Sequence, residues 1–329
     1  MGSTIVRFVI VRFDMLDSNR ARTLTQELPP VPRWRDRLFR SDVPAALALL
    51  FPSLFFLTIF TYWPIVQTVD LTLHDFSLGS DSHEYVGLEN VQKVLSDPLF
   101  WKVLRNTAFY TVVTLPLSIA VALTMALLVN GKLKAAGFYR AAFFYPVMIP
   151  SVAAALLWVF ILAPGYGLMS HALQALGLPS IEWLYSSTWA LPAIILVSVW
   201  KLSGYFMIII LAGLQLISEE LYEAADVEGA NVWQKLVHIT IPMLSPTLYF
   251  ILIIGLLYTF QVFDYVYVMT AGGPSDSTNV LIFFIYQNAF RYWDIGYAAT
   301  LALIFMVLST VTLLVLGFTL GRRVFYQGS

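Results

Sequence analysis

The chain of 329 residues has no cysteine and few charged side chains. The lack of cysteine excludes disulfides, thiolate metal sites and a cysteine nucleophile. Charged residues make up 12% of the sequence, whereas a soluble globular protein carries roughly a quarter. The formal net charge is −1, so no overall electrostatic field favours nucleic acid as a partner.

Motifs for metal binding, nucleotide binding and catalysis are also missing. No histidine is followed four residues later by a histidine or carboxylate on a clear helix, so the sequence predicts no metal site. The histidines are His74, His83, His171 and His238. There is no G-x-x-x-x-G-K-[ST] loop for phosphates. No His–carboxylate or Ser–Lys grouping is visible, so we expect no catalytic residue and no cofactor in this chain.

Long apolar runs are what the chain has in abundance. Hydrophobic residues make up 59% of it, and its mean hydropathy is +0.75. A helix needs about 20 residues to cross roughly 30 Å of hydrocarbon, and six runs are long enough. Lipid offers no hydrogen-bond partner to the backbone, so the runs are expected to be helices. The sequence predicts an all-α polytopic membrane protein with spans at residues 44–69, 103–129, 138–163, 188–214, 246–270 and 297–320.

The distribution of Lys and Arg predicts the orientation of these spans. If both termini are cytoplasmic, the inner segments hold fourteen of the nineteen Lys and Arg residues. Positively charged residues collect on the cytoplasmic side of membrane proteins. The prediction is therefore a multi-pass membrane protein with its N- and C-termini inside.

Three regions follow from this topology. Residues 1–43 form an Arg-rich cytoplasmic tail, residues 44–320 form the six-helix transmembrane domain, and residues 321–329 form a second cytoplasmic tail. The apolar run Ile5–Leu16 is short, is interrupted by charges and lacks a small-residue cleavage site, so no cleavable signal peptide is predicted. On the outer side, Leu88–Leu95 is expected to be a short amphipathic helix, and Gly272-Gly273-Pro274 is expected to form a turn.

The segment Glu223–Pro246 is polar, although it lies between two apolar runs. Acidic residues gather where its first helix begins, at the end that the helix dipole makes favourable for negative charge. Ser218 is a suitable N-cap for this helix. Gly229 permits a sharp turn. The acidic residues are Glu219, Glu220, Glu223, Asp226 and Glu228.

A second short helix is expected after the turn, because apolar residues recur there at spacings of three and four. Those residues are Trp233, Leu236, Val237 and Ile241. Pro242 and Pro246 are expected to limit the continuation of this helix. The loop of residues 218–246 would then be a two-helix elbow on the cytoplasmic side. The elbow either docks a partner protein or lies flat on lipid, and its acidity disfavours the anionic inner leaflet.

The elbow resembles the EAA loop of the permeases of binding-protein-dependent ABC importers. That pattern is Glu-Ala-Ala, three residues, Gly, and an Ile-x-x-Pro ending. This chain has Glu223-Ala224-Ala225, Gly229-Ala230 and Ile239-Thr240-Ile241-Pro242. Ser218 stands where the family has a proline, a departure that affects only the start of the helix.

The resemblance extends over roughly residues 44–320 and is strongest to the sugar-importer subclass, of the maltose and glycerol-phosphate types. It rests on these further segments: Trp200-Lys201, Leu211–Gln215, Leu221-Tyr222, Ala271–Pro274, Tyr286-Gln287 and Gly296–Ala298. It implies the fold of a type I ABC importer permease and a place in a bacterial or archaeal cytoplasmic (inner) membrane. The implied function is import of a sugar, such as an oligosaccharide, by alternating access.

The resemblance also implies partners and coupling residues. Such permeases pair with a second homologous permease, bind two ATPase subunits that carry ATP and Mg²⁺, and receive substrate from an extracytoplasmic solute-binding protein. By carry-over, the residues that couple to the ATPase are Glu223, Ala224, Ala225 and Gly229.

A substrate route is expected where polar groups lie at membrane depth, since such groups are costly in lipid. With the resemblance, this reasoning selects positions on the fourth and fifth spans: Ser198, Trp200, Lys201, Gly255, Tyr258, Thr259 and Gln261. The aromatic members either stack on sugar rings or pack as ordinary core. Lys201 either faces the cavity, where it would suit an acidic oligosaccharide, or reaches the outer interface. The sequence leaves neutral and acidic sugars equally open.

Two other functions remain as alternatives. A secondary transporter or channel with an interfacial cytoplasmic helix would need an internal inverted repeat or an ion relay, and Asp264 is the one candidate relay carboxylate in the predicted spans. A membrane-embedded enzyme would need a catalytic grouping that the sequence does not display. Neither alternative requires the elbow.

Overall fold

The structure is a computed structural model that describes residues 42–76, 84–131 and 135–321. The predicted tails lie largely outside these residues. The chain divides between Ile65 and Val66 into two units, which are described separately.

The first unit is a helical run. It contains α3 (Asp42–Leu57) and a π-helical turn η1 (Thr58–Tyr62), and α4 (Trp63–Thr72) continues the run into the second unit. Phenylalanine rings four residues apart stack along it: the centroids of Phe51 and Phe55 are 5.8 Å apart, and those of Phe56 and Phe60 are 6.0 Å apart. Residues Ala46–Thr72 are long and apolar enough to cross a membrane, at the place where the sequence predicts the first span.

The described part of the second unit is mainly helical and contains a small antiparallel pair of strands, β1 (His74–Asp75) and β2 (Glu84–Tyr85). The predicted amphipathic helix is present as α5 (Glu89–Ser96). The remaining elements are α6 (Pro98–Asn130), α7 (Ala136–Met148), α8 (Ser151–Ile161), α9 (Leu168–Ala175), α10 (Ala190–Leu214), α11 (Glu219–Val227), α12 (Val232–Lys235), η2 (Leu236–Thr240), α13 (Ile241–Met243), α14 (Ser245–Phe260), α15 (Asp264–Met269), α16 (Leu281–Tyr286), η3 (Gln287–Arg291) and α17 (Ile295–Leu320).

Among the described residues, five helices are long and apolar enough to span a membrane, and a bent pair makes a sixth. Five of the predicted spans appear as helical runs within a few residues of their predicted ends, at Ala46–Thr72, Pro98–Asn130, Ala190–Leu214, Ser245–Met269 and Ile295–Leu320. The all-α polytopic fold is thus confirmed, and the third predicted span differs from the prediction in being a bent pair of helices.

The third predicted span, residues 138–163, is not one continuous helix. Its two halves, α7 and α8, are bent by 100° at Ile149–Pro150. Ile149 is extended, with φ −77° and ψ 127°. Pro150 explains the break, because proline lacks an N–H and disfavours the helical conformation of the residue before it. A non-helical stretch at Gln261–Phe263 separates α14 from α15 inside the fifth predicted span, but the two helices still form one candidate span, Ser245–Met269.

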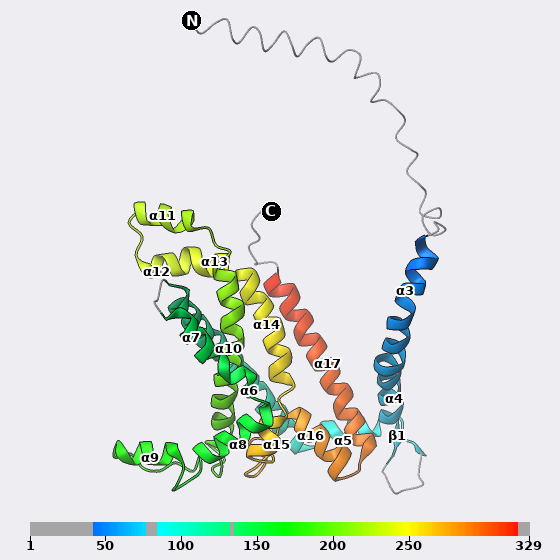
Figure 1. Cartoon of the computed structure of the whole chain (residues 1–329). Coiled ribbons are helices and arrows are strands. Elements are labelled where there is room, and N and C mark those ends of the chain that lie inside the picture. The colour runs from blue at the N-terminus through cyan, green and yellow to red at the C-terminus, as the bar shows by residue number, and fades with distance from the viewer. Residues whose placement is uncertain (1–41, 77–83, 132–134, 322–329) are drawn as a thin grey trace, which may run out of the picture. The chain divides into compact units, whose positions relative to one another are not determined.

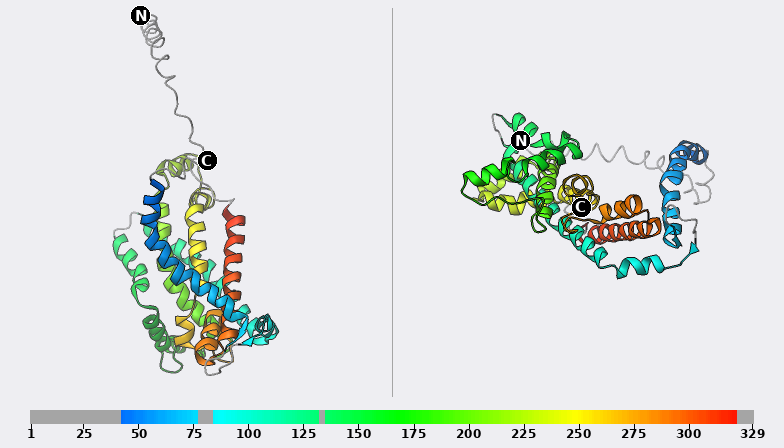
Figure 2. Two further views of the ribbon diagram at one scale, coloured as in Figure 1. Left: turned by 90° about the vertical axis from the view of Figure 1, so that its right-hand side faces the viewer. Right: turned by 90° about the horizontal axis from the view of Figure 1, so that it is seen from below.

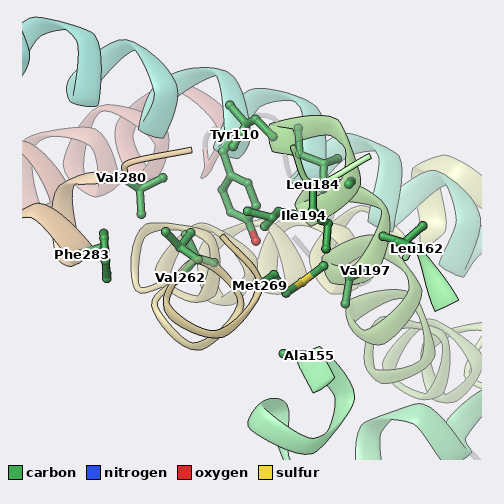
Figure 3. Close-up of a cluster of buried hydrophobic side chains, with 14 of the residues drawn as sticks. Tyr110, Ala155, Leu162, Leu184, Ile194, Val197, Val262, Met269, Val280 and Phe283 are labelled. Atoms are coloured by element: carbon green, nitrogen blue, oxygen red, sulfur yellow. The ribbon is translucent and has the colours of Figure 1, made fainter. Parts of the chain in front are cut away.

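Helix α10 is at the centre of the second unit and contacts α6, α7, α14 and α15. Buried side chains form three clusters around it and its neighbours. In one of them, Tyr110 of α6 lies among Ile194, Val262 and Met269 from α10 and the α14–α15 region (Figure 3). Close packing on several sides fixes the rotation of α10, and so determines which of its residues face the cavity described below.

The two ends of this unit are built differently (Figures 1 and 2). Helices α11, α12 and α13 lie at one end, where they form the predicted elbow, here defined as Glu219–Met243. The opposite end carries α5, α8, α9, α15 and α16. Long helices, among them α10 and α14, connect the two ends.

The loop after α15 is held by hydrogen bonds to α6. Asn106 Nδ2 donates to the carbonyl oxygens of Asp276 (2.9 Å) and Asn279 (3.0 Å). Asn279 Nδ2 donates in turn to Asp276 Oδ1 and Gln287 Oε1, both at 3.0 Å. The predicted turn is present, and Gly272 occupies the left-handed region with φ +85°. These bonds fix the loop against the start of α6.

Gly204 of α10 provides a test of the packing against α7. A Cβ atom at Gly204 would lie 2.3 Å from the backbone oxygen of Phe143. Gly204→Ala should therefore push α7 and α10 apart and destabilise the solubilised protein by about 1–3 kcal/mol. Thermal unfolding in detergent measures the effect.

Gly137→Ala in α7 is the matched control, because nothing lies within 4 Å of a Cβ built there. The control should be neutral or slightly stabilising, since alanine favours helix over glycine. Equal unfolding temperatures for the two variants would contradict the close α7–α10 crossing.

Candidate functional site

A cavity of about 340 Å³ lies where the two helix breaks face each other. Val147 and Ser151 flank the α7–α8 break, and Gln261, Phe263 and Asp264 flank or form the α14–α15 break. Its volume is within the range of small-molecule sites. In membrane proteins, non-helical backbone at membrane depth is tolerated where it is buried in protein or lines a cavity. The non-helical backbone of the two breaks is therefore tolerated because it lines this cavity.

Lys201 of α10 faces this cavity. Its Nζ donates to the carbonyl oxygen of Ile149 at 2.5 Å and to Ser151 Oγ at 3.2 Å. These acceptors are at the α7–α8 break, so the ammonium satisfies a carbonyl that a continuous helix would have bonded internally. The sequence left open whether Lys201 faces the cavity or reaches the outer interface, and in the structure it lines the cavity.

The cavity carries one formal charge of each sign. Asp264 also lines it, and no ion pair joins its carboxylate to Lys201 within 4.0 Å. Both groups are available to a polar ligand, although Lys201 already donates to two protein acceptors. This charge balance does not by itself favour an anion over a neutral polyol.

Tyrosine side chains make up much of the remaining lining. The rings of Tyr205 and Tyr258 meet edge to face with centroids 5.9 Å apart. The Tyr110 hydroxyl donates to Ser198 Oγ at 2.7 Å, and Ser198 Oγ donates to the Ile194 carbonyl at 2.9 Å. Aromatic faces next to hydroxyl groups suit a ligand that has both C–H surfaces and hydroxyls.

The predicted substrate-route residues separate into two groups. Ser198, Lys201, Tyr258 and Gln261 line the cavity together. Trp200, Gly255 and Thr259 do not line it.

Each residue of the second group is held in packing. Trp200 meets Trp158 edge to face at 5.6 Å. A Cβ on Gly255 would lie 2.3 Å from Leu115 Cδ1. Thr259 is buried and donates to the Leu256 carbonyl at 3.0 Å. Gly255 and Thr259 share one face of α14, which is turned to the core, whereas Tyr258 lies on another face.

Sequence reasoning missed several lining residues, among them Tyr110, Ser151, Tyr205 and Tyr265. Their signal was present, because a tyrosine or serine inside an apolar run is a polar group at membrane depth. The sequence offered no means to separate such tyrosines from those that anchor at the membrane interface.

The elbow, which follows the C-terminal end of α10, is closed by local hydrogen bonds. Helix α11 ends in a Schellman motif: the N–H of Ala230 donates to Ala225 at 2.9 Å, and that of Gly229 donates to Asp226 at 3.0 Å. Gly229 has φ +76°, which glycine adopts without strain. Ser218 is the N-cap residue as predicted, but its side chain makes no capping bond.

The second arm of the elbow begins with a capping box, in which Asn231 and Gln234 bond each other's backbone N–H at 2.9 and 2.8 Å. The arms are joined by an ion pair of Lys235 with Asp226 and by a 3.0 Å hydrogen bond between Tyr222 and Thr240. The elbow is therefore held in one conformation by contacts within this chain.

Pro242 and Pro246 limit the second arm as expected, because α13 ends at Met243 and α14 begins separately at Ser245, with Pro246 in its first turn. The helical path continues through Pro242 into α13 after the π turn η2. Proline in a helix removes a backbone N–H and crowds the carbonyl four residues earlier. The wider π turn, which ends at Thr240 just before α13, accommodates this loss.

The predicted coupling residues lie on the elbow with different exposure. Glu223, Ala224 and Gly229 are exposed, whereas Ala225 is buried, with an exposed fraction of 8%. The tip of the elbow presents apolar side chains, with exposed fractions of 90% for Val227 and 83% for Val232. Trp233 is next to them and is also largely exposed. Exposed apolar groups rimmed by acids are typical of a protein-binding surface.

The conformation of Gly229 gives a direct test of the elbow. Gly229→Ala should destabilise the last turn of α11 by about 1–2 kcal/mol, because a Cβ disfavours the left-handed region. Gly229→Asn should cost less, since asparagine enters this region more readily. Amide hydrogen exchange of α11 measures the effect as faster exchange.

Gly131→Ala is the control for this experiment, because Gly131 has φ −71° and nothing lies within 4 Å of a Cβ built there. If Gly229→Ala left exchange in α11 as slow as Gly131→Ala does, the turn would not depend on a positive φ.

A family profile, two relatives in sequence and a solved structure resemble this chain. The family profile described as "Binding-protein-dependent transport system inner membrane component" matches residues 115–324. The sulfoquinovosyl glycerol transport system permease protein SmoG of Agrobacterium fabrum is 35% identical over 280 residues, which cover 85% of this chain and 91% of SmoG. The lactose transport system permease protein LacF of Rhizobium radiobacter is 34% identical over 266 residues, 79% of this chain and 88% of LacF.

A solved structure of a bacterial alginate ABC transporter in complex with an alginate pentasaccharide-bound periplasmic protein has the same fold. The superposition gives a TM-score of 0.75 at 24% sequence identity, and covers 87% of this chain and 96% of the matched chain.

Proposed function

The chain belongs to the family of binding-protein-dependent transport system inner membrane components, and we propose that it is the permease subunit of an ATP-driven importer for a sugar or oligosaccharide. This proposal rests on the presence of a cavity and an elbow in the same unit of the structure. A cavity lined by tyrosines, hydroxyls and one charge of each sign lies among the spans. An elbow with an exposed apolar tip lies at the end of the same helices.

The cavity is the proposed substrate site. Sugar rings combine C–H faces with many hydroxyls, and the cavity offers aromatic rings beside Ser198, Lys201 and Gln261. Relatives support this substrate class, since SmoG is named for sulfoquinovosyl glycerol and LacF for lactose. Neutral and acidic substrates are both compatible with a cavity that holds Lys201 and Asp264.

The elbow is the proposed contact with an ATPase. Val227, Val232 and Trp233 would bury their side chains in a groove of that partner, and Glu223 would meet a basic group or a helix N-terminus there. The chain would pair with a second homologous permease, and an extracytoplasmic solute-binding protein would deliver the sugar. ATP and Mg²⁺ would be held by two ATPase subunits, and this chain would contribute no catalytic residue.

The proposed mechanism is alternating access. Closure of the ATPases on ATP draws the two elbows of the heterodimer together. Helices α10 and α14 run from the elbow end to the cavity, so the movement reaches the cavity and opens it to the outside. A secondary transporter or channel has no need of an elbow of this construction, and family membership favours the importer.

The test is uptake by the purified assembly. Co-purification with mass spectrometry should identify a second permease and an ATPase, and proteoliposomes of this assembly should accumulate radiolabelled sugar when ATP and the binding protein are supplied. A chain that purifies alone and still transports would contradict the proposal.

Coupling is tested by a double variant of the elbow. Glu223→Ala combined with Gly229→Ala should leave membrane insertion and basal ATP hydrolysis intact and reduce uptake at least tenfold, because the contact with the ATPase is lost. ATP hydrolysis and sugar uptake are measured in parallel on one preparation, and these give the ratio of sugar transported to ATP hydrolysed. Glu182→Ala, an exposed carboxylate on the opposite end, is the control and should keep the ratio of the unmodified protein. Unchanged uptake in the double variant would refute the coupling role.

Orientation is tested by labelling, which the absence of cysteine makes simple. We expect cytoplasmic N- and C-termini and a cytoplasmic elbow, with α9 and its flanking loops outside. In intact cells, a membrane-impermeant maleimide should label Glu182→Cys and should not label Glu228→Cys until the membrane is permeabilised. Both positions are exposed, so the reverse pattern would invert the topology.

A further inference from the structure

A second pocket, of about 440 Å³, lies at the end of the unit opposite the elbow. It is formed by the start of α6, the residues just before and at the start of α10, and the loop after α15. The polar residues that line it are Lys102, Arg105, Asn106, Ser187, Thr188, Ser275 and Ser277. With one exception, treated next, their side chains end in groups that donate hydrogen bonds to an oxyanion. We call it the outer pocket, in accordance with the proposed orientation.

The exception is Asn106, whose side-chain oxygen can only accept a hydrogen bond. Its Nδ2 group is already committed to the loop after α15. Asn106 therefore shapes the pocket by fixing the loop. The groups left to meet a ligand are two cations and four hydroxyls.

The charge of the outer pocket is not balanced by the protein. Lys102 and Arg105 are three residues apart on α6, so they share a face of the helix and repel each other. Within the described part of the chain, no carboxylate lies within 4.0 Å of either group. Asp276, on the adjoining loop, accepts from Asn279 and does not line the pocket. This arrangement differs from the central cavity, where Asp264 accompanies Lys201.

The donors of the outer pocket are only partly used. Lys102 Nζ donates to the Ser275 carbonyl at 2.6 Å, which leaves two of its three N–H groups. Ser277 Oγ is buried without a hydrogen-bond partner among the described residues, and a buried polar atom of this kind is costly to leave unsatisfied. An oxyanion in the pocket would accept from both cations and from the hydroxyls.

The outer pocket lies on the approach to the central cavity. Both are built on α6 and α10. Arg105 precedes the cavity residue Tyr110 by five residues, roughly 8 Å along the helix axis. Leu191 of the outer pocket precedes Ser198 by seven residues, roughly 10 Å. A ligand in the outer pocket is therefore one to two helical turns outward of the central cavity.

We propose that the outer pocket binds an oxyanion, a carboxylate, sulfonate or phosphate group, carried by the incoming sugar. This inference rests on the proposed function and adds the substrate class: a sugar with an acidic group, selected before it reaches the charge-balanced cavity. The same chemistry is offered by an acidic side chain of the solute-binding protein, and the test separates the two sources.

The experiment is chemical protection of Arg105 in the purified assembly in lipid nanodiscs. Phenylglyoxal modifies arginine, and peptide mass spectrometry reads Arg105 and Arg291 separately. Digalacturonate should slow modification of Arg105 about two- to fivefold, the scale of an exposed ion pair. Its uncharged dimethyl ester should give no protection, and about 0.5 M KCl should abolish the effect by screening. Arg291, outside the pocket, should be unaffected.

Variants of the second cation sharpen the test. Lys102→Gln should reduce the protection of Arg105, and Lys102→Arg should retain it. Lys93→Gln, an exposed lysine on α5 outside the pocket, is the matched control and should change nothing. Since Lys102 also bonds the loop, all three variants are checked for monodisperse elution.

The outcomes are distinct. Protection by digalacturonate and not by the ester supports an acidic group on the sugar. Protection by the sugar-free binding protein and not by digalacturonate supports the oxyanion but assigns it to that protein. The absence of protection by either overturns the inference. Failure of ATP-driven uptake by the unmodified assembly would instead overturn the proposed function, which this protection experiment does not require.

Discussion

The hydrogen bond from Lys201 to the carbonyl of Ile149 is the contact on which the central cavity depends. Backbone groups released inside a membrane must find partners within the protein, and the 100° bend at Ile149–Pro150 releases such a group. Lys201 satisfies it at 2.5 Å and bonds Ser151 beside it. The bend directs α8 toward α15, and the space between the breaks is the cavity. A charge that would be costly in lipid is thus stabilised by the same contact that shapes the site.

Much of the fold could be predicted because its main signal is the length of the apolar runs. This length can be read along the sequence without knowledge of contacts between distant residues. Five spans follow directly from that signal, and the amphipathic helix α5 follows from its residue pattern. The break at Ile149–Pro150 does not, because Pro116 lies inside the continuous helix α6 while Pro150 ends α7. Which proline interrupts a helix depends on whether neighbouring groups can satisfy the released carbonyls, and this is decided by packing between helices distant in sequence.

The site was predicted in part for a similar reason. Polarity at membrane depth identified Ser198, Lys201, Tyr258 and Gln261, all of which line the cavity. It also selected Gly255 and Thr259, which face the core because the rotation of α14 is set by its contacts with α6 and α10. In the elbow, the glycine turn and the order of the helices were readable from residue types. The passage through Pro242 was not, because a π turn has no clear sequence signature.

The construction of the elbow has a consequence for the affinity of a docked partner. A segment that folds only on binding loses conformational entropy at that moment, and its affinity is reduced accordingly. The Schellman motif at Gly229, the capping box at Asn231 and the contacts between the two arms order the elbow within this chain. Docking therefore requires ordering of only the exposed side chains at the tip. Cycles of engagement and release then change the position of an already folded element, and each cycle avoids a refolding step.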